Sequence, residues 1–214
     1  MPSPPLQLHL RDLSQALVEA WREEFAGLPH ITISRGDIFS EREGTVSSSD
    51  PIDIRADAIL SPANSFGFMD GGIDAVYTYQ LGPQVQERLR DLLARELGGE
   101  LPVGQAVLVP TGRPEIPWCI SAPTMRVPMD VSDTANAFLA FRAALRCVQA
   151  HNETTPRNPI RSLLTPGLGT AVGRMPPARC ARQMKEAWVR TIVGPPFIPR
   201  SLREAANDEL RLRE

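Results

Sequence analysis

The sequence predicts a three-layer α/β sandwich built around a central mixed, mainly parallel β-sheet. Short apolar segments of strand length alternate with longer segments of helical periodicity through most of the 214 residues. Two of the connections that lead from a strand to a helix are rich in glycine, as is typical of ligand-binding edges in such sheets. The length suits one domain with a sizeable core.

Several segments have the composition or the period of β-strands. Residues 6–10 alternate apolar and polar side chains, the pattern of a half-buried strand. Residues 56–60 form a short apolar run before Pro62, which indicates a strand buried on both faces. Further strands are expected at 31–33, 106–109, 118–120 and 160–164.

Helices are expected between most of these strands. Asp12 is the predicted N-cap of a helix that extends to about Phe25. The apolar face of that helix carries Leu13, Leu17, Trp21 and Phe25, four residues apart. Further helices are expected at 73–81, 83–97, 134–149, 177–192 and 202–213, and the polar stretch 40–55 is predicted to be a loop.

We predict a single domain over residues 1–193, with its characteristic motifs within 31–192. The strand and helix at 6–28 are expected to join the same sheet layer. Residues 194–214 are interpreted as a hinge at Gly194-Pro195-Pro196 followed by a charged helix. That helix could pack on the domain, pair between subunits or stay mobile, and the sequence does not rank these alternatives.

The composition argues against several classes of protein. A formal net charge of −2 gives no electrostatic reason to expect duplex nucleic acid or a membrane surface as partner. The first residues lack the basic start and apolar run of a signal peptide, and a cytoplasmic location is expected. The three cysteines and three histidines show no metal-ligand spacing. We therefore expect neither a metal nor another cofactor, and the oligomeric state stays open.

Two glycine-containing loops form the candidate ligand site. The first covers residues 61–74 and the second residues 165–176, each directly after a predicted strand. Glycine lets the backbone approach a ligand closely and present its N–H groups to an anion, and a helix start adds a favourable dipole. Neither loop matches the P-loop or GxGxxG spacing. Two such loops facing each other would hold a diphosphate; tight turns at strand ends are the alternative interpretation.

The order of the short motifs resembles that of macro domains. Gly36-Asp37-Ile38 is followed by Pro62-Ala63-Asn64-Ser65, Gly71-Gly72-Ile73-Asp74, Gly104-Gln105-Ala106 and the 167–176 loop. The resemblance covers roughly residues 31–192. It implies binding of ADP-ribose or an ADP-ribosylated protein, and hydrolysis of an ADP-ribosyl ester or O-acyl-ADP-ribose bond. A non-catalytic ADP-ribose reader, and a structural or assembly protein that keeps the fold, are the alternatives.

The resemblance also implies roles for individual residues. Asp37 would accept a hydrogen bond from the adenine amino group, and Asn64 would bind the distal ribose. Asp74 would orient or activate the attacking water, so Asp74 and Asn64 are the candidate catalytic residues. The candidate ligand-binding residues are Asp37, Ile38, Asn64, Gly71, Gly72, Ile73, Gly167, Leu168, Gly169, Thr170, Ala171, Val172 and Gly173. Each side chain has a plainer reading: Asp37 as a cap, Asn64 as a turn residue, and Asp74 as a favourable first-turn residue of the next helix.

Some features depart from the family pattern. Phe68-Met69-Asp70 stands where the hydrolases usually have glycines, and Ala171-Val172 stands where an aromatic ring usually covers the distal ribose. The final strand, whose end supplies a ring that stacks on adenine, is not recognisable after Ile192. Phe39 and Phe197 are candidates for that stacking. Arg126 could pair with a phosphate, or equally well with Asp130 or Asp133.

Overall fold

The computed structural model describes residues 5–41 and 52–214. The first four residues of the chain and most of the predicted loop at 40–55 lie outside the described residues. None of the described helices is both long enough and apolar enough to cross a membrane.

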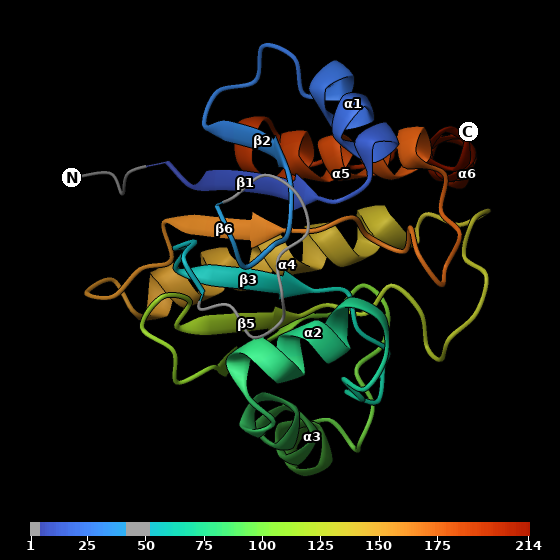
Figure 1. Cartoon of the computed structure of the whole chain (residues 1–214). Coiled ribbons are helices and arrows are strands. Elements are labelled where there is room, and N and C mark those ends of the chain that lie inside the picture. The colour runs from blue at the N-terminus through green and yellow to red at the C-terminus, as the bar shows by residue number, and fades with distance from the viewer. Residues whose placement is uncertain (1–4, 42–51) are drawn as a thin grey trace.

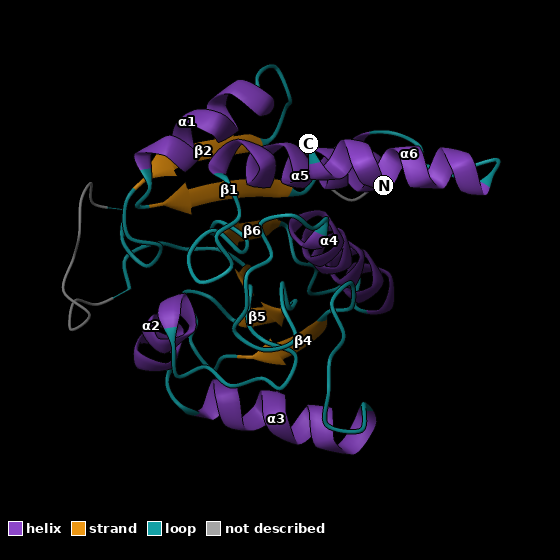
Figure 2. Ribbon diagram, turned by 90° about the vertical axis from the view of Figure 1, so that its right-hand side faces the viewer, coloured by secondary structure: helices purple, strands orange, loops and turns teal. Residues whose placement is uncertain are grey.

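One mixed sheet forms the centre of the molecule, and its described strands follow the order β2-β1-β6-β3-β5-β4 (Figures 1 and 2). All neighbouring strands are parallel except the edge strand β4, which pairs antiparallel with β5. This confirms the predicted mixed, mainly parallel sheet. The strands are β1 (Gln7–Asp12), β2 (Ile31–Arg35), β3 (Ala58–Ser61), β4 (Val107–Pro110), β5 (Trp118–Ser121) and β6 (Ser162–Thr165).

Helices cover both faces of the sheet, as the two views show (Figures 1 and 2). One layer contains α1 (Gln15–Glu24), α4 (Asn136–Thr154) and α5 (Pro177–Trp188), and the other contains α2 (Gly72–Leu81) and α3 (Gln84–Glu96). Alternate residues of the central strands enter the two cores: Leu60 packs with the first layer and Ile59 with the second. Both faces of these strands are therefore apolar, and the predicted three-layer architecture is confirmed.

The start of the first helix differs from the prediction, because Ser14 is the N-cap of α1. Its Oγ accepts a hydrogen bond from the Leu17 N–H (3.4 Å). Asp12 still belongs to β1, and its carboxylate accepts hydrogen bonds from the N–H groups of Ser14 (2.9 Å) and Gly167 (3.0 Å). Leu13 therefore precedes the helix and is 48% exposed instead of joining its buried face.

The end of the chain packs on the first helix layer. α5 continues into a π-helical turn, η1 (Val189–Val193), which ends where the Gly194 N–H donates to the Val189 carbonyl (2.7 Å). The following helix, α6 (Leu202–Arg213), buries Leu212 in the core cluster that also contains α1, α4 and α5. Of the three arrangements left open for this helix, the structure has the one packed on the domain.

Candidate functional site

A cavity of about 520 Å³ opens at the carboxyl edge of the parallel strands. Its walls come from the end of β1, the segment after β2, the loop after β3 with the start of α2, the segment after β5, and the loop after β6. Carboxyl ends of parallel strands are the usual ligand-binding edge of α/β sheets.

Every predicted site residue except Leu168 lines this cavity. The structure thus brings together Asp37, Asn64, Asp74 and both glycine-containing loops. Leu168 lies in the loop after β6, but its side chain is fully buried in the core. Its N–H donates to Cys180 Sγ (3.4 Å), so neither its side chain nor its amide is available to the cavity.

The loop after β6 has a run of backbone N–H groups with no acceptor among the residues that the structure describes. The amides of Gly167 and Leu168 are used by Asp12 and Cys180, and those of Arg174 and Met175 close the loop onto Ala171 and Gly169. Between these pairs, the N–H groups of residues 169–173 donate to no described residue. A run of such amides in a turn suits an anionic ligand.

Two glycines of this loop are closely packed. A Cβ at Gly173 would lie 2.6 Å from the Gly169 carbonyl oxygen and 2.6 Å from Val131 Cγ2. A Cβ at Gly167 would meet Leu17 Cδ2 at 2.4 Å, the end of a flexible side chain. Gly173 therefore needs glycine because backbone lies against it, independently of any ligand, whereas at Gly167 the neighbouring side chains would have to shift.

The start of α2 forms another wall of the cavity. Gly71 is its N-cap and has no side chain to satisfy the first amides, and the N–H groups of residues 71–74 donate to no described residue. These amides, with the positive end of the helix dipole, provide a second set of donors for an anion.

The side chain of Asn64 is partly occupied within its own loop. Its Oδ1 accepts from the N–H groups of Phe66 (3.1 Å) and Phe68 (3.3 Å), and its Nδ2 donates to the Phe68 carbonyl (2.7 Å). These bonds hold the side chain at the cavity wall and leave the second Nδ2 proton for a ligand.

Asp74 lies in the first turn of α2, at the floor of the cavity. The residue is only 8% exposed, and its Oδ1 accepts a hydrogen bond from the Ser61 hydroxyl (2.5 Å). Burial raises the pKa of Asp74 to about 6, against the opposing effect of the Ser61 hydrogen bond. A carboxylate that titrates close to neutrality can exchange a proton with a bound water.

Asp37 is held in place by a side chain of β1 and by its own carboxylate. The Arg11 Nε donates to the Asp37 carbonyl (2.8 Å), and Asp37 Oδ1 accepts from the Phe39 N–H (2.9 Å). The second carboxylate oxygen of Asp37 has no donor among the described residues, and the side chain lines the cavity.

The segment after β5 braces the loop that carries Asn64. Thr124 Oγ1 donates to the Pro62 carbonyl (3.1 Å), and the Ser65 N–H donates to the Arg126 carbonyl (3.1 Å). The Arg126 guanidinium makes a bidentate ion pair with Glu100 (2.7 and 3.0 Å) and lies over the Phe66 ring. Neither of the two carboxylates predicted as partners of Arg126, Asp130 and Asp133, is thus correct, because Glu100 comes close only through the fold.

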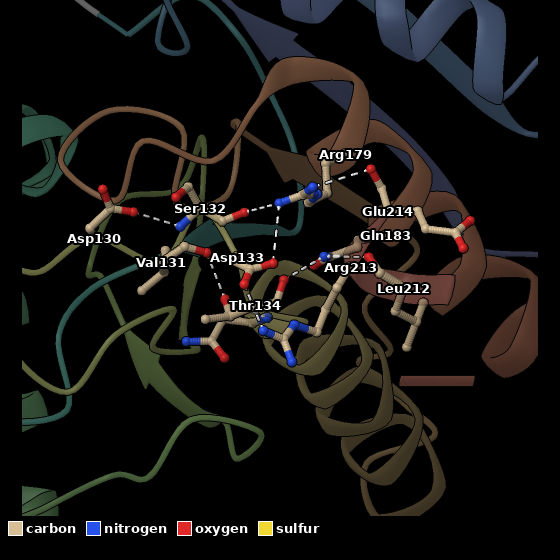
Figure 3. Close-up of polar contacts among 11 residues, drawn as sticks. Asp130, Val131, Ser132, Asp133, Thr134, Arg179, Gln183, Leu212, Arg213 and Glu214 are labelled. Carbon is tan, nitrogen blue, oxygen red and sulfur yellow. Dashed lines mark hydrogen bonds and ion pairs between the residues drawn. The ribbon is translucent and has the colours of Figure 1, made fainter. Parts of the chain in front are cut away.

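The loop after β6 is braced in turn by residues 130–134. The Val131 N–H donates to the Gly173 carbonyl (2.9 Å). Figure 3 shows how this segment is tied to α5 and α6: Arg213 pairs with Asp133 (2.8 Å), and Gln183 donates to the Thr134 carbonyl (2.7 Å). The end of α6 is thereby connected to a wall of the cavity.

Neither ring considered for adenine stacking lies at this cavity. Phe39 is buried in the second core, where it packs edge-on against Tyr77. Phe197 belongs to a different cavity near α4 and η1. The apolar residues that do line the site include Leu13, Ile38 and Val172.

Sequence reasoning missed the contribution of the first strand to the site. Arg11, Asp12 and Leu13 all line the cavity because β1 lies between β2 and β6. Thr124 and Met125 were also missed as cavity residues, although they lie a few residues after the predicted strand 118–120, which was the available signal.

Together, the fold and the cavity define a three-layer α/β protein with a pocket lined by backbone amides at the carboxyl edge of its sheet. The chain belongs to the macro-domain family, whose model matches residues 60–184.

Relatives and solved structures agree with this family. An uncharacterized protein of Aquifex aeolicus is 37% identical over 134 residues, covering 63% of this chain and 73% of that protein. The macro domain-containing protein SCO6450 of Streptomyces coelicolor is 30% identical, covering 64% and 76%. The macrodomain of Mycobacterium tuberculosis DarG shares the fold with a TM-score of 0.54 at 21% identity, covering 73% and 97%. A variant of the Oceanobacillus iheyensis macrodomain, solved with ADPR, has a TM-score of 0.51 at 17% identity, covering 73% and 85%.

Proposed function

We propose that this protein binds ADP-ribose in the cavity at the carboxyl edge of the sheet, as the free nucleotide or as the ADP-ribosyl group of a protein. The observation that carries the proposal is the pair of unpartnered amide runs at residues 71–74 and 169–173, both lining one cavity. A diphosphate would accept hydrogen bonds from both. The macrodomain solved with ADPR supports the same class of ligand.

The polar side chains of the cavity suit the two ends of such a ligand. Asp37, at one end, has an acceptor oxygen for the adenine amino group. Asn64 and Asp74, carried by the loop after β3 and the start of α2, would lie at the distal ribose. The diphosphate would then lie between the two amide runs.

We further propose that the protein hydrolyses an ADP-ribosyl ester or O-acyl-ADP-ribose bond. For the ester, water attacks the anomeric carbon of the distal ribose, the bond from that carbon to the ester oxygen breaks, and a carboxylic acid departs. Asp74 would take the proton from the water and return it to the leaving carboxylate. Its burial at the cavity and its pKa of about 6 support this role. The alternative is a reader that binds without turnover.

Calorimetric titration tests the binding proposal. We expect ADP-ribose to bind with micromolar affinity, about −8 kcal/mol, and AMP to bind much more weakly because it lacks the diphosphate and distal ribose. The absence of both heat and thermal shift at millimolar ADP-ribose would leave the structural or assembly alternative as the explanation of the fold.

Asp37→Ala should weaken ADP-ribose binding by roughly 1–3 kcal/mol, because the buried adenine amino group loses its acceptor. The measurement is calorimetry on the variant and the parent, with circular dichroism to check the fold. Unchanged affinity for ADP-ribose would restrict Asp37 to its bond with the Phe39 N–H.

Asp74→Ala should lower turnover by roughly 10²–10⁴-fold, the usual effect of removing a positioned general base, while most of the ADP-ribose affinity remains. Release of ADP-ribose is followed over hours in the parent first, since a reader releases none. Asp70→Ala is the matched control, because Asp70 is an exposed carboxylate at the same cavity. Activity that survives in Asp74→Ala and disappears in Asp70→Ala would move the catalytic role to Asp70.

A further inference from the structure

A second cavity, of about 440 Å³, lies between α4, the π-helical turn η1, the segment after it and α6. Three arginines line it: Arg142 and Arg146 from α4, and Arg190 from η1. It shares no lining residue with the cavity at the carboxyl edge of the sheet. Its volume falls in the range of small-molecule sites.

Of these arginines, only Arg190 bonds to carboxylates of the described part of the chain. Its guanidinium bonds to Asp208 (2.7 and 2.9 Å) and to Glu186 (3.0 and 2.8 Å). Arg211 and Lys185 also contact these two carboxylates, so three cations already share two anions there. The negative charges of Asp208 and Glu186 are therefore already balanced, and they do not neutralise Arg142 or Arg146.

Arg142 and Arg146 have no carboxylate partner among the described residues. They are four residues apart on α4 and so lie on one face of that helix. Arg142 is half-buried, with its guanidinium over the Phe138 ring (5.0 Å to the ring centre). Burial, together with the charges of Arg146 and Arg190, lowers the pKa of Arg142. Two like charges held together at a cavity are unfavourable until an anion joins them.

The shape of the cavity adds an apolar wall to these charges. The Phe197 ring lines it, is 38% exposed, and lies under the Arg190 guanidinium (5.1 Å). The π-helical turn that supplies Arg190 and Thr191 is a rare element that often occurs beside functional sites.

We propose that this cavity binds a small phosphate monoester whose organic part packs against Phe197. A phosphate monoester carries a charge of about −1.5 to −2 at neutral pH, which matches the two unpaired guanidinia. Planar guanidinia also bind phosphate oxygens in a bidentate manner. The second site does not depend on the ADP-ribose proposal, because no residue is shared between the two cavities.

The test is calorimetric titration with phenyl phosphate, inorganic phosphate and benzenesulfonate. Phenyl phosphate should bind most tightly, inorganic phosphate more weakly because it lacks the ring, and benzenesulfonate more weakly because it carries a single charge. Equal affinity for benzenesulfonate would overturn the charge argument, and no detectable binding of phenyl phosphate would overturn the site.

Two variants locate the binding. Arg142→Gln and Arg146→Gln should each weaken phenyl phosphate binding by about tenfold or more, the effect of losing a charge-assisted hydrogen bond. Arg157→Gln, which removes the same charge from an exposed position outside both cavities, should leave it within about twofold. Because Arg146 is exposed, its variant should fold normally even if Arg142→Gln proves unstable. Unchanged phenyl phosphate affinity in Arg146→Gln would show that the ligand binds elsewhere.

Discussion

At the scale of single residues, Asp74 shows how position changes the chemistry of a carboxyl group. It is the first-turn acid of α2, where the helix dipole favours its charge, yet it is also buried on the floor of the cavity. Burial has the larger effect on the pKa, which rises to about 6 in spite of the Ser61 hydrogen bond. The ordinary helix-start role and the proposed catalytic role are therefore compatible in one residue.

This pKa makes the stability of the protein depend on pH in a specific direction. The folded state binds the Asp74 proton more tightly than the unfolded chain does, so the stabilisation is complete below about pH 4 and is lost as the pH rises through about 6. A rise from 3.8 to about 6 corresponds to about 3 kcal/mol. The free energy of unfolding of Asp74→Asn should therefore rise relative to that of the parent between about pH 4 and pH 6. Above about pH 6 the difference should stay constant.

Urea unfolding at a series of pH values measures that difference, with Asp70→Asn as the control for loss of a nearby charge. An Asp74→Asn advantage that is the same at pH 4 and pH 7 would contradict the raised pKa.

At the scale of elements, the loop after β6 combines close packing with open hydrogen-bonding capacity. Gly167 and Gly173 are pressed against neighbouring atoms, while the amides of residues 169–173 between them donate to no described residue. The Asp12 carboxylate accepts from the Gly167 N–H, and the Val131 N–H donates to the Gly173 carbonyl, so both ends of the loop are held. The rest of the protein thus fixes the position of the loop, while the N–H groups at the cavity keep their hydrogen-bonding capacity. A preorganised anion site has these two properties.

Gly173→Ala should disturb this loop and weaken ADP-ribose binding, because its Cβ would lie 2.6 Å from the Gly169 carbonyl oxygen. We expect a loss of roughly 1–3 kcal/mol in the free energy of unfolding. Gly71→Ala is the matched control for stability: Gly71 lines the same cavity, its φ is −138°, and an added Cβ meets nothing within 4 Å. Thermal and urea unfolding compare the two variants. Equal stability of both would mean that the loop relaxes without cost.

At the scale of the whole molecule, Gln183 joins three parts of the fold. This fully buried amide donates to the carbonyls of Thr134 (2.7 Å) and Leu212 (2.8 Å) and accepts from the Phe138 N–H (3.1 Å). It therefore links α5 to the start of α4. Figure 3 shows its bonds to the end of α6 and to the 130–134 segment, which braces the loop after β6.

Gln183→Leu should keep the side-chain volume close to that of Gln and leave three buried backbone groups without partners. We expect it to lower the free energy of unfolding by roughly 2–4 kcal/mol. Gln15→Leu is the control, since Gln15 is exposed and bonds only to Glu19, and its effect should stay within about 0.5 kcal/mol. Chemical denaturation measures both. A Gln183→Leu variant as stable as the parent would show that the buried Leu212 side chain and the ion pairs of α6 are enough to hold this helix on the domain.

The local pattern of the sequence determined the elements and the location of the two glycine loops at the cavity. The limits of α6 were predicted as the structure has them, and the other helices and strands differ mainly by a few residues at their ends. The glycine loops after β3 and β6 were also identified from the sequence. Periodicity and turn composition depend on neighbouring residues along the chain, so they can be read without knowing the fold.

Only the tertiary structure decided which side chains meet at the site. The insertion of β1 between β2 and β6 brought Arg11 and Asp12 to the cavity and turned Asp12 from a predicted cap into an acceptor for Gly167. The same long-range packing paired Arg126 with Glu100 and buried the Leu168 side chain. Strand order and the direction of loop side chains are set by contacts between residues far apart in the chain. The free energies of such contacts cannot be read from a local sequence pattern.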